Sequence, residues 1–323
     1  LRYIILSMES EEEIIRFIWK ILCKESYESM NFEDAVAIKI GRKYIVLNID
    51  GIEENSVWIP GFTAYDIGWR AVIGSLSDIF VKGAAPLGII TYIGLNNSFS
   101  VDFLSNIIRG MRDAAAEYNT PILGGDLGRS KEFIIVVASI GITDKVILRK
   151  GAKVGDIVYT TGLFGETSLL YKCFLENLCH PICKDIFNKN HAPKPKFDKW
   201  VKILRYASSS IDSSDGLAKS LYQLAQANNA GIIIENIPIS INVRKICDIL
   251  KLDYVKLCLY EGGEEFEAIF TISPEQESKV IEIAKENDIP IYRLGKVVAK
   301  KGVWIKTKDK LLKIQNIGWD KLR

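Results

Sequence analysis

The sequence predicts an α/β protein of two domains, each built from layers of strands and helices. Its 323 residues exceed the size that one hydrophobic core usually serves. Strand-like and helix-like segments alternate in both halves, which is typical of α/β or α+β layers. A loop over Arg149–Asp156 follows the strands of the first half, and a new buried strand begins after it. We therefore expect an N-terminal domain over residues 1–148 and a C-terminal domain over 149–323.

The N-terminal half begins with a predicted helix over residues 9–24, with acids in its first turn and apolar residues at helical spacing. A strand over 44–50 follows and ends in an aspartate. The longest helical patterns cover about 63–82 and 101–118. Predicted strands over 122–123 and 133–142 complete this half.

In the C-terminal half, a buried strand is predicted over residues 157–162. Helices are expected at about 166–187, 216–229 and 275–287, and strands at 231–236, 267–272, 290–298 and 302–306. The stretch 188–199 contains Pro193 and Pro195, so we expect it to be a connecting loop.

The composition excludes several classes of protein. The net charge of +2 gives no support for a nucleic-acid partner. No apolar run approaches the ~20 residues that a membrane span needs, and the first residues are too short for a signal peptide. We expect a cytoplasmic protein with reduced cysteines. Only Cys179, His180 and Cys183 hint at a zinc site, and thiols on a helix face explain them as well.

Short turns that carry carboxylates are the main indication of function. Asp34, Asp50, Asp78, Asp126 and Asp212 each lie at or near the end of an apolar run, beside small residues. If the fold gathers these acids, their mutual repulsion requires hard cations, and Mg²⁺ held by carboxylates and substrate phosphates is the expected chemistry. The sequence therefore predicts a phosphoryl-transfer enzyme. It contains no P-loop and no protein-kinase motif.

The sharpest single motif is Asp212-Ser213-Ser214-Asp215, directly before a helical pattern. A helix cap accounts for one of these residues. A helix N-terminus that meets phosphate while the acids hold Mg²⁺ accounts for all four. The run Gly262-Gly263-Glu264 has the alternative of a polar turn, and Arg149 is either a phosphate clamp or a surface arginine.

In chain order, the motifs E-D-A-V-A, I-D, G-W-R-A-V-I-G-S-L-S-D-I-F-V-K-G-A-A-P, L-G-G-D, L-R-K-G-A-K-V-G-D, I-D-S-S-D-G-L and G-G-E-E-F-E resemble the thiamine-monophosphate kinases. These enzymes belong to the AIR synthase-like ATP-binding superfamily. The resemblance implies a two-domain fold whose N-terminal halves pair into a β-barrel across a homodimer. It also implies ATP-dependent phosphorylation of thiamine monophosphate to thiamine diphosphate, with several Mg²⁺ ions.

The resemblance also implies a role for each matching residue. The Mg²⁺ ligands would be Asp34, Asp50, Asp78, Asp126, Asp212 and Asp215. Gly125, Asp126, Arg149 and Ser214 would contact ATP, with Arg149 and Asp126 taking part in catalysis. Glu264 and Trp319 would lie near the thiamine moiety. Because the acceptor phosphate is already ionised near neutral pH, the transfer needs charge neutralisation and alignment more than a strong base.

The chain departs from the family pattern at four places. Met30-Asn31-Phe32-Glu33-Asp34 replaces a G-I-G-D-D start, Ile49 replaces a threonine, Val57 stands at the position of a histidine, and G-G-E-E replaces G-G-E-D. These changes leave two alternatives open. One is a related ATP-dependent enzyme with another phosphorylated acceptor, and the other is a nucleotide-binding dimer that has lost catalysis.

Overall fold

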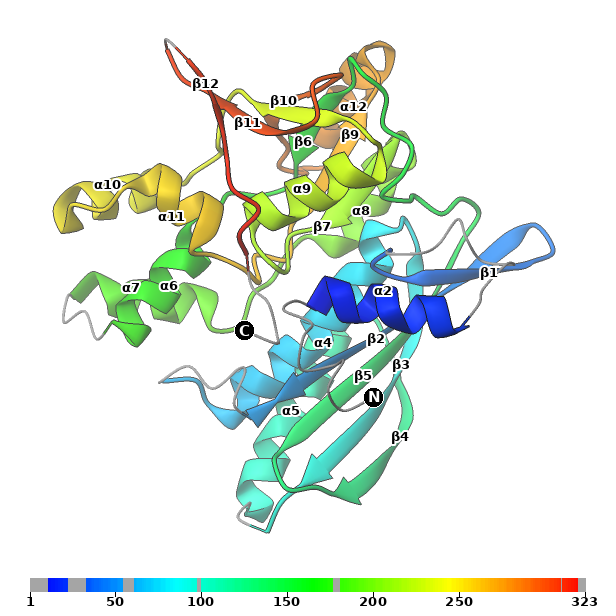
Figure 1. Ribbon diagram of the computed structural model, residues 1–323. Helices are drawn as coiled ribbons and strands as arrows, with labels where there is room; N and C mark the ends of the chain where they lie inside the picture. The colour runs from blue at the N-terminus through cyan, green and yellow to red at the C-terminus, as the bar shows by residue number, and fades with distance from the viewer. Residues whose placement is uncertain are drawn as a thin grey trace.

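The structure is a computed structural model, which describes residues 11–22, 33–54, 61–97, 100–176, 181–308 and 310–318. Its strands form two sheets, one from each half of the chain (Figure 1). The fold is mixed α/β, as the sequence predicts. None of the helices that the structure describes combines the length and the apolarity that a membrane span requires.

The N-terminal sheet has five strands in the order β1-β2-β5-β3-β4. Its strands are β1 (Val36–Ile40), β2 (Lys43–Glu53), β3 (Ala85–Leu95), β4 (Ile122–Arg129) and β5 (Ile134–Thr143). Only β3 and β4 pair in parallel; the other neighbours are antiparallel. Within the described residues the sheet is open, because its edge strands β1 and β4 do not pair with each other.

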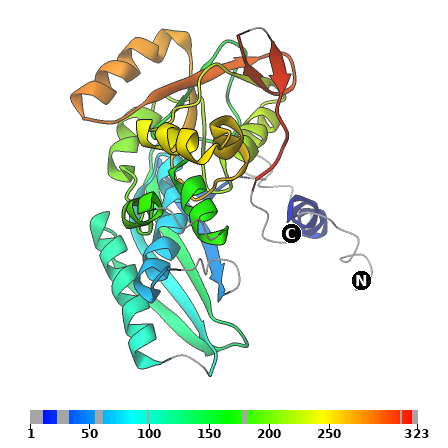
Figure 2. The ribbon, with the colours of Figure 1, turned by 90° about the vertical axis from the view of Figure 1, so that its left-hand side faces the viewer.

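Two helices cover one face of this sheet: α4 (Ala64–Val81) and α5 (Val101–Glu117) (Figure 2). Nearly all of α4 is buried, which explains why its sequence is apolar on every side. The two helices approach closely where Gly68 and Gly110 carry no side chain, since a Cβ at either position would overlap a carbonyl oxygen of the other helix. None of the described helices packs on the other face of the sheet. That face presents a row of exposed apolar side chains: Val36, Ile38, Ile40, Ile49 and Ile90.

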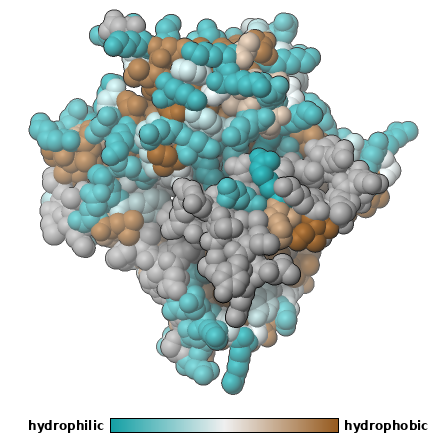
Figure 3. Space-filling model, in the orientation of Figure 1, coloured by the Kyte–Doolittle hydropathy of each residue, from teal (hydrophilic) through white to brown (hydrophobic). Residues whose placement is uncertain are grey.

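The C-terminal sheet has seven strands in the order β12-β11-β8-β10-β6-β9-β7. The strands are β6 (Ile157–Thr160), β7 (Ser209–Asp212), β8 (Gly231–Ile234), β9 (Ala268–Ile272), β10 (Tyr292–Val298), β11 (Gly302–Lys306) and β12 (Leu311–Lys313). Its helices are α6 (Glu166–Leu175), α7 (Pro181–Asn190), α8 (Phe197–Leu204), α9 (Leu217–Ala227), α10 (Ile241–Leu250), α11 (Tyr254–Tyr260) and α12 (Pro274–Glu286). On the face that Figure 3 shows, the apolar patches of this half are small and lie among hydrophilic residues.

One apolar cluster joins the two halves. It contains Val72 and Phe80 of α4, Phe197 and Trp200 of α8, and Phe270 of β9. The aromatic rings of Phe80 and Phe197 stack with their centroids 5.2 Å apart. This shared core fixes α4 against the end of β7, and both elements carry predicted metal ligands.

Several predicted elements differ from the structure. The helix expected over 166–187 is two helices, because α7 begins at Pro181, which cannot lie inside a continuous helix. The loop expected over 188–199 is shorter, since α7 ends at Asn190 and α8 begins at Phe197. The helix predicted over 9–24 is present as α2 (Glu11–Leu22), which lies apart from both sheets in Figure 2.

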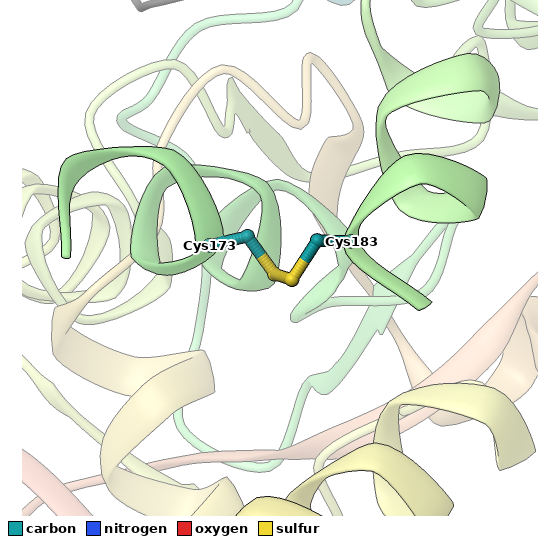
Figure 4. The surroundings of a disulfide bond; sticks show 2 residues. All are labelled: Cys173 and Cys183. Carbon is teal, nitrogen blue, oxygen red and sulfur yellow. A yellow bond between two sulfur atoms is a disulfide. The ribbon is translucent and has the colours of Figure 1, made fainter. Parts of the chain in front are cut away.

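The expectation of reduced cysteines is wrong for one pair. Cys173 of α6 and Cys183 of α7 form a disulfide, with their Cα atoms 5.6 Å apart (Figure 4). The pair forms because the two helices are neighbours and bring both thiols to the same buried contact. Cys183 is therefore not free to bind zinc, and Cys179 and His180 lie outside the described residues. Cys247 and Cys258 are free and buried.

Candidate functional site

Three of the predicted acids converge in space. Asp34 precedes β1, Asp78 lies on α4 and Asp212 ends β7, and one carboxylate oxygen from each lies within 4.8 Å of the others. All three are far apart in the sequence, so only the packing of α4 between the two sheets brings them together. Three carboxylates at this spacing suit a divalent cation with oxygen ligands.

Asp50 lies on β2 beside this group. Its Oδ2 atom would lie 3.1 Å from a Cβ at position 74 of α4, so the absence of a side chain at Gly74 leaves room for it. Its charge contributes to the raised pKa of Asp78, after burial and the charges of Asp212 and Asp34. The convergence of Asp50 with the three-acid cluster follows from the close packing of β2 against α4.

The structure adds Asn48, which the sequence did not indicate. Its side-chain amide donates a hydrogen bond to Asp78 Oδ2, and its Oδ1 accepts one from Ser75 Oγ at 2.7 Å. Asn48 and Asp50 share the face of β2 that packs on α4, which alternation along the strand requires. Alternation in a known strand was the one feature that could have identified it.

The side chains of Lys82 and Arg149 bind the Asp34 end of the acid cluster, together with the neighbouring Glu33. Lys82 Nζ lies 2.6 Å from Asp34 Oδ2 and 2.6 Å from Glu33 Oε2. Arg149 donates to Asp34 Oδ1 from Nε, at 3.0 Å, and from Nη2. The backbone N–H of Arg149 also lies 2.9 Å from each carboxylate oxygen of Glu33. Asp34 is thus bound on both oxygens.

The pKa values of the clustered acids differ because Lys82 and Arg149 contact only the Asp34 end of the cluster. Burial alone would raise the pKa of Asp34, but Arg149 and Lys82 lower it to about 2. Burial and the neighbouring charge of Asp34 raise the pKa of Asp212 to about 7. Burial and the charges of Asp212, Asp34 and Asp50 raise the pKa of Asp78 well above its usual value. Among the described residues no lysine or arginine pairs with Asp78 or Asp212, so this end needs an added cation to hold its full charge.

The Asp212–Asp215 turn does not cap α9 with a side chain. Gly216 is the N-cap residue, and no side-chain hydrogen bond closes that end. Asp212 instead accepts hydrogen bonds from Ser77 Oγ at 2.7 Å and from Ser214 Oγ at 3.2 Å. Asp215 pairs with Lys219 at 2.8 Å. The side-chain capping interpretation of this motif is therefore wrong, and its first acid, Asp212, joins the acid cluster instead.

Backbone hydrogen bonds join the Gly262–Glu267 loop to the Asp212–Asp215 turn. The Glu264 N–H donates to the Ser214 carbonyl at 2.7 Å, and the Phe266 N–H donates to the Ser213 carbonyl at 3.1 Å. Both Glu264 and Phe266 have positive φ angles, of 56° and 51°, which is unusual for residues with side chains. The two loops therefore form one unit, and a displacement of either displaces the other.

Glu264 is held by two further side chains. Arg70 of α4, which is fully buried, and Tyr171 of α6 both donate to Glu264 Oε2. Arg70 also donates to the carbonyl of Asn190 at 3.1 Å. The guanidinium therefore ties the Glu264 loop to α4 and to the end of α7, and Glu264 remains about 29% exposed.

Asp126 and Gly125 lie elsewhere in this chain. Both are on the exposed edge strand β4, where Asp126 pairs with Tyr92 of β3. Following the register across the sheet, Asp126 shares a face with Tyr92, Val136 and Gly51. Asp126 thus points to the open apolar face, whereas Asp50 points to α4. Trp319 and Val57 lie outside the described residues.

Comparison with known proteins gives the class first. Residues 32–143 match the family model of the AIR synthase related protein, N-terminal domain. The AaThiL complex with AMPPCP and TMP superposes with a TM-score of 0.85 at 23% identity, covering 97% of both chains. The fold is therefore AIR synthase-like, with the acid cluster where its two halves meet.

Curated relatives then give the family. The thiamine-monophosphate kinase of Pyrococcus abyssi is 33% identical over 296 residues, which is 90% of each chain. The thiamine-monophosphate kinase of Nitrosopumilus maritimus is 30% identical over 323 residues, covering 98% of this chain and all of that one. The chain belongs to the thiamine-monophosphate kinase family.

Proposed function

We propose that this protein transfers the γ-phosphoryl group of ATP to thiamine monophosphate, giving ADP and thiamine diphosphate. Family membership and the fold shared with a complex of AMPPCP, an ATP analogue, and TMP support this reaction. The observation that carries it is the convergence of Asp78 and Asp212, with Asp34 beside them, in a cluster whose carboxylate oxygens suit a hard divalent cation. We place the enzyme in the cytoplasm, where ATP is available.

In this proposal Asp78, Asp212, Asp50 and Asp215 hold Mg²⁺, which neutralises and aligns the phosphates. Two anions must approach each other for an in-line transfer, so compensation of charge is the main requirement. Arg149 contributes a fixed guanidinium, and its side chain remains 16% exposed at the edge of the cluster. The Ser214 hydroxyl lies beside Asp212 and can contact a phosphate oxygen.

The acceptor is proposed to bind on the Glu264 side. Thiamine carries a positively charged thiazolium ring, and a partly exposed carboxylate is a suitable counter-charge. Arg70 and Tyr171 fix the direction of Glu264, so the carboxylate is oriented before the acceptor arrives. Hydrogen bonds between the Glu264 loop and the Asp212–Asp215 turn keep acceptor and metal sites at a constant separation.

A homodimer completes the site in this account. The open face of the N-terminal sheet exposes Ile49 to 72% and Ile90 to 43%, which is unusual for a surface that stays in water. Two such faces can close into a barrel, which brings β4 of one copy beside β1 of the other. Asp126, on β4 of one copy, would then lie beside β1 of the other, the strand that directly follows Asp34.

The reaction is tested by incubating the purified protein with ATP, Mg²⁺ and thiamine monophosphate. Thiamine diphosphate is measured by fluorescence after oxidation to its thiochrome, and ADP by a coupled assay. We expect both products in equal amounts. ADP and inorganic phosphate without thiamine diphosphate would mean that the phosphoryl group passes to water, which would contradict the proposal. The absence of both products would favour a different phosphorylated acceptor or a dimer without catalysis.

A further inference from the structure

Lys82 is a buried cation inside the acid cluster. It follows α4 directly, as the C-cap residue, and its side chain has no exposed surface. The carboxylates that it contacts are equally enclosed, with Glu33 3% and Asp34 1% exposed. Its ammonium lies 2.6 Å from an oxygen of each and 3.4 Å from the Ser210 carbonyl.

This arrangement resembles the coordination of a metal ion. Two carboxylate oxygens and a carbonyl oxygen surround one cationic centre that water does not reach. A divalent ion bound by carboxylates uses the same kinds of donor. A lysine is seldom buried unless carboxylates pair with it, so Lys82 and the Glu33–Asp34 pair depend on each other.

Asp78 and Asp212, the other acids of the cluster, have no such cationic partner among the described residues. Asp78 and Asp212 accept hydrogen bonds from Asn48, Ser77 and Ser214, but within the described ranges neither forms an ion pair. The protein's own cations are therefore concentrated at the Glu33–Asp34 end. The Asp78–Asp212 end is left for ions from solution.

We propose that Lys82 is a built-in counter-cation that occupies one cation position of the cluster. Divalent ions then bind at the Asp78–Asp212 end, and the Glu33–Asp34 pair takes none. This inference rests on the proposed use of Mg²⁺ by the same site. It assigns Asp34 a positioning role, through Lys82 and Arg149, in place of a metal ligand.

The test counts Mn²⁺ ions bound to the nucleotide-free protein, using the electron paramagnetic resonance signal of free Mn²⁺. Lys82→Met removes the ammonium but keeps most of the side-chain volume, so the Glu33–Asp34 pair should bind an additional Mn²⁺. Lys172→Met is the matched control. Its ammonium also bridges two carboxylates, Glu176 at 2.8 Å and Glu261 at 3.1 Å, but these lie outside the cluster.

Thermal unfolding gives an independent readout. Lys82→Met should melt at a lower temperature than the wild type in chelator, and Mn²⁺ should raise its melting temperature more than that of the wild type. If Lys82→Met does not fold, Lys82→Gln replaces it, because its amide can still donate to Glu33. Folded Lys82 variants that bind the same number of Mn²⁺ ions as the wild type would overturn the proposal. This count does not depend on whether the wild type makes thiamine diphosphate.

Discussion

In the proposed mechanism, the negative charge of Asp212 serves catalysis but lowers the stability of the ion-free protein. Its buried carboxylate has a pKa raised to about 7 by burial and by Asp34. Asp212→Asn keeps the shape and allows hydrogen bonds with Ser77 and Ser214, but it removes the negative charge. We expect turnover to fall by roughly 100-fold or more, because a cation ligand is lost.

The same substitution should stabilise the ion-free protein by on the order of 1 kcal/mol, since repulsion with Asp78 disappears. Urea unfolding in chelator measures this change. A variant that is both active and no more stable than the wild type would contradict the metal role of Asp212.

The buried acids also predict how stability depends on pH. Burial raises the pKa values of Asp212, Glu265 and Glu267 to about 7 in each case. Between about pH 4.5 and pH 7 the folded chain therefore holds more protons than the unfolded chain, so stability falls as the pH rises. We expect the free energy of unfolding in chelator to be lower at pH 8 than at pH 5 by roughly a few kcal/mol.

Mg²⁺ should remove the part of this loss that comes from Asp212 and leave the part from Glu265 and Glu267. Urea titrations at both pH values, with and without Mg²⁺, separate the two contributions. A protein that becomes more stable from pH 5 to pH 8 without divalent ions would be inconsistent with this account.

Tyr171 tests the orientation of Glu264. Tyr171→Phe removes one of the two donors to Glu264 Oε2 but keeps the aromatic ring. We expect the KM for thiamine monophosphate to rise about 10-fold, which corresponds to one hydrogen bond to a charged group, with little change in the KM for ATP. Tyr159→Phe is the control, because the Tyr159 hydroxyl contacts Glu277 at 2.7 Å, away from the site. An equal rise in both KM values would argue against an acceptor-side role.

At the residue scale, the sequence identified the acids but missed their partners. Asp34, Asp78 and Asp212 stand out because each lies at or near the end of an apolar run, beside small residues. Asn48 and Lys82 lie inside apolar segments, where a single polar residue has no distinctive pattern. Lys82 also accounts for the departure at Glu33, whose carboxylate reaches this buried ammonium. Only the packing of α4 shows that these residues belong to the site.

At the scale of elements, α4 positions the site, and the contact between α4 and α5 fixes where α4 lies. Gly110→Ala would drive a methyl group into the Tyr65 carbonyl oxygen of α4. We expect a loss of roughly 1–3 kcal/mol in unfolding free energy, because overpacking forces the helices apart. Arg109→Ala on the same helix, which is exposed, should change stability by less than about 0.5 kcal/mol. Equal stabilities of the two variants would mean that the helices can separate freely.

The long, strongly patterned elements were predictable from sequence, and the short or interrupted ones were not. Both α4 and α5 match the expected ranges of 63–82 and 101–118 closely. Strand β3 was missed because Pro86 and Gly88 at its start are typical of turns. Helix α8 was missed because Pro193 and Pro195 suggested a loop, although apolar residues at helical spacing follow them.

At the scale of the whole molecule, the open face of the N-terminal sheet predicts the proposed dimer. Ile90→Arg places a charge on that face, and we expect a monomer in sedimentation experiments. Val101→Arg, at an exposed position on α5, should leave the assembly unchanged. An Ile90→Arg variant that sediments like the wild type would rule out this face as the interface.

The proposed dimer would also explain why a single chain gathers only some of the predicted metal ligands. The sequence places Asp126 with the other metal ligands by resemblance, whereas a single chain directs it to the opposite face of the sheet from Asp50. No pattern within one chain can reveal that a site is completed by a second copy. The ligand role of Asp126 therefore stays a prediction, tied to the dimer.

The acid cluster is proposed to support direct transfer of a phosphoryl group between two anions. The most direct measurement follows ATP labelled with ³²P at the γ-position, in the presence of Mg²⁺ and thiamine monophosphate. We expect the label to appear in the terminal phosphate of thiamine diphosphate, in proportion to the ADP formed. Label found only in inorganic phosphate, or retained in ATP, would contradict it.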